Sequence, residues 1–169
     1  HMQGLSLKNV ELTVYNGKNK PVFREFGEML FTHFGVSGPL VLSASAHLRD
    51  WGKEQYRLSI DLKPALDQQK LEARILRDIS ESPNRDVEKL LCGLVPHSMA
   101  PVMTRRLGFP PTLKANSLTK EQRRGLVELL KHFAILVTGV RPVAEAIVTA
   151  GGVKVSEVKP NTMESKLVE

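Results

Sequence analysis

GEMLFTHFGVSGP, residues Gly27–Pro39, combines aromatic side chains, one histidine and three glycines within thirteen positions. This is not the composition of an ordinary core strand, because glycine allows backbone conformations and close approaches that other residues do not. The pattern predicts an apolar strand that runs into a Gly/Ser turn, with a helix following at Pro39–His47. A helix that starts after such a turn has free backbone N–H groups, so this corner is a candidate site for an anionic or polar ligand group.

Alternation of apolar and polar residues on both sides of this stretch predicts a β-sheet. Leu5–Tyr15 alternates as a half-buried strand does. Asn16–Gly17 favours a hairpin, because both residues tolerate a positive φ. The partner strand is expected within Lys20–Phe34, with a break around Gly27, and Tyr56–Leu62 alternates again. Three such segments indicate an antiparallel sheet or a small barrel.

The middle of the chain has helical periodicity. Asp67–Ser80 carries an apolar stripe, and two shorter helices are expected, one through Leu91 and one capped by Ser98 and ending at Gly108. The clearest helix is Thr119–His132, because Thr119 and Gln122 have the spacing of a capping box. One face carries the apolar side chains, and the opposite face carries Lys120, Arg124 and Lys131. The apolar side chains are Leu126, Leu129, Leu130 and Phe133.

After this helix the pattern returns to β-structure. The expected strands are Phe133–Val140, Ala144–Thr149 and Val153–Val158. The predicted fold is therefore α+β. An antiparallel sheet or barrel subdomain is formed in two pieces, residues 5–62 and 133–160, and a helical subdomain, residues 63–132, is inserted between them.

Composition places the chain among ordinary globular proteins. It has 169 residues, of which 41% are hydrophobic and 25% charged. No apolar run approaches the roughly 20 residues that a membrane helix needs. Cys92 is the only cysteine, which excludes a disulfide framework; its apolar helical context predicts a buried thiol and a cytoplasmic location. The histidines lack ligand spacing, so no metal site is expected.

Positive charge is concentrated in the middle of the chain. The net charge is +6, and residues 70–133 contribute +5, with twelve Lys/Arg against seven Asp/Glu. Such a patch attracts phosphate backbones, although a solvated helical face has the same composition. The candidate RNA-binding residues are Arg105, Arg106, Lys120, Arg123, Arg124 and Lys131, with Lys114 nearby.

A resemblance to a known family adds to this picture. Gly27–Pro39, read with VTAGGV (Val148–Val153) and PNTMESKLVE (Pro160–Glu169), resembles the bacterial HI0933-like FAD-dependent oxidoreductases. In that family a long insertion interrupts a Rossmann domain, and this chain resembles the insertion alone. The Gly-x-Gly-x-x-Gly fingerprint of a dinucleotide site does not occur here.

The resemblance also sets expectations for the ends of the chain. His1–Met2 is interpreted as a cloning scar, and residues 161–169 as a linker that returns to a missing FAD domain. In an interrupted domain, Leu5 and Val158 should lie close together in space.

The resemblance implies roles for particular residues. It implies that His33 faces the flavin, where it would hydrogen-bond the flavin or the substrate or act as an acid/base group. A structural histidine beside two phenylalanines fits the sequence equally. The resemblance also implies cofactor contact for a set of small residues, for which a tight turn and a β-bulge are the alternatives. These residues are Gly35, Ser37, Gly38, Pro39, Thr149, Gly151 and Gly152.

The function implied is that of a non-catalytic, substrate-facing insert. The parent would be a bacterial FAD-dependent oxidoreductase that reduces a uridine in large-subunit ribosomal RNA, and the insert would shape the site over the flavin and contact the RNA. One alternative is a stand-alone basic nucleic-acid-binding module without enzymatic activity. Another is a structural domain that serves only oligomerisation of the parent.

Overall fold

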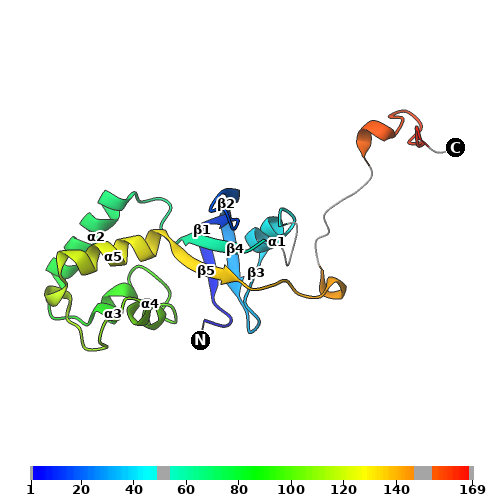
Figure 1. The fold of residues 1–169 in the computed structure, drawn as a ribbon. Helices are drawn as coiled ribbons and strands as arrows, with labels where there is room; N and C mark the ends of the chain where they lie inside the picture. Colours follow the sequence, from blue (N-terminus) through cyan, green and yellow to red (C-terminus); the bar gives the residue numbers. More distant parts are fainter. Residues whose placement is uncertain (1, 49–53, 147–153, 168–169) are drawn as a thin grey trace.

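A curled, open sheet of five antiparallel strands is the main feature of the computed structural model, which describes residues 2–48, 54–146 and 154–167 (Figure 1). The strands lie in the order β3-β2-β1-β4-β5. Their bounds are β1 Ser6–Tyr15, β2 Pro21–Phe31, β3 Val36–Ser37, β4 Tyr56–Asp61 and β5 Phe133–Val137. The antiparallel sheet predicted from alternation is confirmed.

A bulge in β1 adjusts which residues face the core. The register against β2 shifts between Leu7 and Val10, and Asn9 in this interval has φ +57°. Strict alternation would place Leu7 and Val10 on opposite faces of the sheet. Because the bulge adds a residue, both side chains are buried.

The β1–β2 hairpin is confirmed, but its turn is wider than Asn16–Gly17. The Asn16 N–H donates to the carbonyl of Lys20 at 3.0 Å, and the Asn16 side-chain oxygen accepts from the N–H groups of Lys18 and Lys20. Asn19, not Gly17, has the left-handed backbone conformation, with φ +57°. The asparagine side chain therefore closes a longer loop.

Strand β2 runs through Gly27 without a break, so the predicted interruption is wrong. Gly27 pairs with Val10, and a Cβ at Gly27 would lie 3.1 Å from the Leu40 side chain. Leu40 belongs to α1 (Pro39–Ser45), which packs on β2. Gly38 precedes this helix with φ +95°, and a Cβ there would lie 3.0 Å from Met29 Cα. Both glycines allow α1 to approach the strand.

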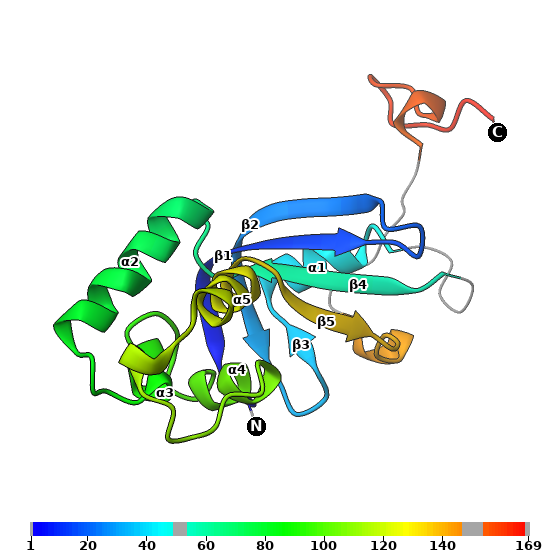
Figure 2. The same cartoon turned by 60° about the vertical axis from the view of Figure 1, so that its left-hand side comes forward.

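Four helices lie between β4 and β5 in the sequence, and both views show them grouped at one end of the sheet (Figures 1 and 2). They are α2 Gln68–Glu81, α3 Val87–Leu91, α4 Ala100–Arg106 and α5 Lys120–Lys131. The capping box of α5 is confirmed. Ser98 does not cap α4, because the N-cap position is Met99 and no side chain bonds there.

Sheet and helices share a single hydrophobic cluster. It joins sheet residues such as Leu12 and Ile60 to helical residues such as Leu71 and Leu126. None of the helices in the described ranges is long and apolar enough to cross a membrane. Cys92 is only half-buried, and its Sγ donates to the Glu88 carbonyl oxygen at 3.4 Å.

The chain beyond β5 does not extend the sheet as expected. Residues Val155–Glu157 form a short 3₁₀ helix, so the strand predicted at Val153–Val158 is wrong. Val155 is 84% exposed there, and a β-branched residue favours a strand only where the residue packs on a neighbouring surface. Val143–Glu145 is also a 3₁₀ helix, and the rest of the strand predicted at Ala144–Thr149 lies mostly outside the described residues.

The C-terminal segment 154–167 lies apart from the sheet in both views (Figures 1 and 2). The expected proximity of Leu5 and Val158 is therefore not found. The register also places the last residue of β5, Val137, opposite Tyr56 of β4, at the Tyr15 end of β1. The chain thus enters and leaves the sheet at opposite ends.

The α5 capping box generates a stability prediction. Thr119→Ala removes the acceptor for the Gln122 N–H, which is 3.2 Å from Thr119 Oγ1. We expect the free energy of unfolding to fall by about 1 kcal/mol, measured by urea denaturation. Thr112→Ala, at an exposed loop threonine, is the matched control. Equal effects of the two substitutions would contradict the assigned role of the cap.

Candidate functional site

The Gly/Ser corner first predicted as a ligand site is built from local backbone contacts. The Thr32 N–H donates to the Gly35 carbonyl at 2.8 Å, which closes the turn between β2 and β3. Ser37 pairs with Leu30 across the short ladder. The backbone of β2 fills the space beside Gly38 that a ligand would need. The space beside Gly35, by contrast, is open, so cofactor contact at this corner stays a prediction.

His33 and Phe34 form the exposed tip of this hairpin. The two rings meet edge to face, with centroids 5.0 Å apart. The Arg141 guanidinium lies over the Phe34 ring, 4.8 Å from its centroid, and also pairs with Glu145 at 2.6 Å. The carboxylate in this cluster is thus held by Arg141 rather than by His33. Thr149, Gly151 and Gly152 lie outside the described residues.

A polar cleft of about 460 Å³ lies elsewhere, between the sheet and the helices. It is lined by side chains of β1, β2 and β4 and by residues at the start of α2 and the end of α5. These include Glu11, Thr13, Arg24, Ser59, Asp61 and Lys131. Sequence reasoning missed this cleft, because its residues come from distant segments and share no motif.

Lys131 is the most constrained cation in the cleft. Its Nζ lies 2.5 Å from Asp61 Oδ2, and the two side chains are only 13% and 15% exposed. The ammonium also donates to the carbonyl oxygens of Lys63 and Leu66, at 3.2 and 2.7 Å. Lys131 therefore ties the end of α5 to β4 and to the connection that leads into α2.

Two further predicted RNA contacts also have internal partners. Arg106 donates to the Ala134 carbonyl at 2.8 Å and lies 4.1 Å from the centroid of the Phe133 ring. Partial burial lowers the pKa of Arg106 from its ordinary value. Arg123 donates to the Leu118 carbonyl at 3.1 Å. A count of charges in the sequence gives no signal for such contacts.

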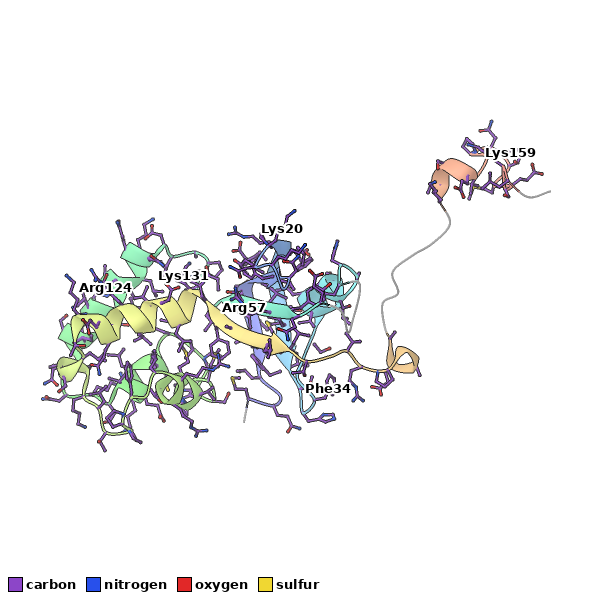
Figure 3. All side chains as sticks on the ribbon, in the orientation of Figure 1. Lys20, Phe34, Arg57, Arg124, Lys131 and Lys159 are labelled. Atoms are coloured by element: carbon purple, nitrogen blue, oxygen red, sulfur yellow. The ribbon has the colours of Figure 1, made fainter. Side chains whose placement is uncertain are left out.

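Arg105, Lys120 and Arg124 remain as exposed cations on α4 and α5. Figure 3 shows Arg124 on α5. The hydrogen bonds and ion pairs found in the described part of the chain do not include the side chains of these three residues. Lys114, by contrast, pairs with Asp86 at 2.5 Å. No group of three or more metal-binding side chains gathers anywhere in the described ranges.

Comparison with known proteins identifies the family. A family model described as "HI0933-like protein barrel and H2TH domain" matches residues 1–148. The chain belongs to the HI0933-like family. The matched residues include the whole curled sheet and the helices attached to it.

Curated relatives of this HI0933-like chain include three that are two to three times longer. A ribosomal RNA dihydrouridine synthase of Escherichia coli (strain K12) is 30% identical over 92% of this chain and 36% of its own length. One of Haemophilus influenzae is 29% identical over 99% of this chain and 38% of its own length. A 3-dehydro-bile acid delta(4,6)-reductase of Clostridium scindens is 25% identical over 85% of this chain and 36% of its own length.

Removing Lys131 should destabilise the fold. Lys131→Met leaves the Asp61 carboxylate largely buried without its cation, so we expect unfolding to become easier by about 3 kcal/mol. Lys120→Met, at the exposed start of the same helix, should change stability by no more than about 0.5 kcal/mol. Adding Asp61→Asn to Lys131→Met should restore part of the loss. Equal denaturation midpoints for the two lysine variants would contradict this role.

The Asp86 ion pairs predict a pH dependence. Hydrogen bonds from Lys114, then from Lys89, lower the pKa of Asp86 below its ordinary value. Its contribution to stability is therefore present above the unfolded-state pKa of about 3.9 and is lost as pH falls through the lower folded-state pKa. The Tm difference between wild type and Asp86→Asn should be larger at neutral pH than at strongly acid pH. A difference independent of pH would exclude this linkage.

Proposed function

We propose that this chain is the substrate-facing, non-catalytic part of an FAD-dependent oxidoreductase that acts on ribosomal RNA. The observation that carries the proposal is the similarity to two ribosomal RNA dihydrouridine synthases, each matched over little more than a third of its length. The greater part of such a protein lies outside the matched region. The FAD and the groups that carry out the reaction belong to that part. The location proposed for the whole protein is the cytoplasm.

The organisation proposed is a sheet with a helical insertion, residues 63–132. This organisation is supported by the two ends of the insertion, which lie side by side. The Leu62 N–H donates to the Leu130 carbonyl at 2.9 Å, next to the pair formed by Asp61 and Lys131. Residues 5–62 and 133–137 supply the strands of this scheme. Its extension to residue 160 rested in part on a strand at Val153–Val158 that the structure does not form, and a linker at 161–169 stays a prediction.

RNA contact is assigned to the exposed cations. Arg105, Lys120 and Arg124 are free to reach phosphates, whereas Arg106, Arg123 and Lys131 bond to carbonyl oxygens of the chain itself. Phosphate contacts of this kind position an RNA without reading its sequence. Roles for His33 as an acid/base group and for Gly35–Pro39 near the cofactor stay predictions for the whole protein.

The bile acid reductase relative favours a second candidate function. Its similarity covers the same fraction of its length, and its name denotes a small molecule, a bile acid, rather than RNA. In that case the chain would cover a small-molecule site in its parent, and its exposed cations would be ordinary solvated residues.

RNA binding over a salt series tests the proposal. A fragment of large-subunit ribosomal RNA should bind the purified chain with an affinity that falls steeply with salt, while added FAD should not bind. Replacing Arg105, Lys120 and Arg124 by Gln should reduce the slope of log K against log salt by about 2, at about 0.7 per phosphate contact.

A matched triple variant controls for net charge. Lys8, Lys18 and Lys20 are exposed on or beside the β1–β2 hairpin, and their replacement by Gln removes the same charge from another surface. This variant should keep the wild-type slope. Equal slopes for both triple variants would remove the helical cations from the interface, and an absence of RNA binding would favour the small-molecule alternative.

A further inference from the structure

The tip of the β2–β3 hairpin presents an aromatic side chain that the fold does not bury. Phe34 is 46% exposed at this tip, and His33 beside it is also exposed. Figure 3 shows Phe34 at the end of the hairpin, well separated from Arg124 and Lys131 on α5. The turn itself is closed by the backbone bond from Thr32 to Gly35, so the ring is not needed to hold the turn.

The neighbours of Phe34 hold its ring in a defined orientation. His33 meets it edge to face, and the Arg141 guanidinium lies over it at 4.8 Å. Arg141 is itself fixed by two donors to the Glu145 carboxylate, at 2.7 and 2.9 Å. An exposed ring bordered by a planar guanidinium and an imidazole is the set of groups on which proteins stack unpaired bases.

We propose that Phe34, with His33 and Arg141, stacks an unpaired base of single-stranded RNA. This inference rests on the proposed function, because it takes the partner to be RNA, but it assigns base contact to residues far from the helical cations. In this arrangement the cations on α4 and α5 bind the phosphate backbone of the RNA, and the hairpin tip binds a base that is no longer paired within an RNA helix.

The shape of the tip favours an RNA base over a bound cofactor. Small-molecule and cofactor sites are concave and enclose most of the ligand. The tip is a projecting turn, and neither the polar cleft nor a second, smaller cleft between α2 and α5 includes any of its residues. A base on a flexible strand needs only one exposed ring face, and the net charge of +6 favours a polyanion.

Phe26 provides a matched control on the same strand. It is 57% exposed, opposite Glu11 in the β1–β2 ladder. The ring and cation contacts found within the described ranges involve Phe34 but not Phe26. Phe26→Leu and Phe34→Leu therefore each remove an exposed phenylalanine ring, but only the ring of Phe34 has these neighbours.

The experiment measures binding of a labelled oligouridine of about 10 nucleotides, a length within the usual site size for single strands. Phe34→Leu should weaken binding about tenfold, the loss expected for one stacked base, without changing the salt slope. Phe26→Leu should bind as wild type does. Phe34→Trp should retain affinity, and the fluorescence of its new indole should be quenched by the RNA. Thermal unfolding of each variant establishes that it is folded.

Each outcome decides between the two proposals. If oligouridine binds and both leucine variants bind equally well, the stacking role is overturned while RNA binding through the helical cations stands. If Phe34→Leu instead weakens binding of riboflavin 5′-phosphate, tested in parallel, the tip faces a flavin and the RNA assignment is wrong. If neither the oligouridine nor the ribosomal fragment binds wild type, the proposed function fails together with this inference.

Discussion

The fold depends on the point where the chain leaves the sheet for the helices and later returns. There a largely buried ion pair joins Lys131 to Asp61, and a backbone bond joins Leu62 to Leu130. A buried charge without its partner costs several kcal/mol, so the cleft around this pair is polar by necessity. Among the described residues, Lys131 is thus a lysine with a structural role, and the predicted RNA-binding cations left free for a partner lie on α4 and α5.

The sequence was most informative where a local pattern determines structure. Alternation predicted the strands, and the spacing of Thr119 and Gln122 predicted the start of α5. It was least informative where a distant contact decides. From the sequence, Gly27 suggests a break in a strand, and only the packing of Leu40 against it explains the glycine. Lys131 and Lys120 are likewise indistinguishable in the sequence, and only the contact with Asp61 shows that Lys131 is structural. The C-terminal valines lacked the neighbouring surface that a strand needs.

Two surfaces of different character therefore carry the candidate functions. One is the set of exposed basic side chains on α4 and α5, suited to a phosphate backbone. The other is the hairpin tip at Phe34, where a ring is held by aromatic and guanidinium contacts. Within the stretch that looked most like a cofactor loop in the sequence, Gly27 and Gly38 allow α1 to approach β2, whereas the Phe34 side chain is exposed.

The adjacent ends of the helical segment have an evolutionary consequence. Strands β4 and β5 pair directly, from Tyr56 opposite Val137 to Ile60 opposite Phe133, so everything between them is, in topological terms, one very long hairpin loop. Lengthening, shortening or exchanging such a loop does not alter the register of the strands that flank it. The helical segment can therefore change in length or sequence while the pairing of β4 with β5, and with it the sheet, stays the same.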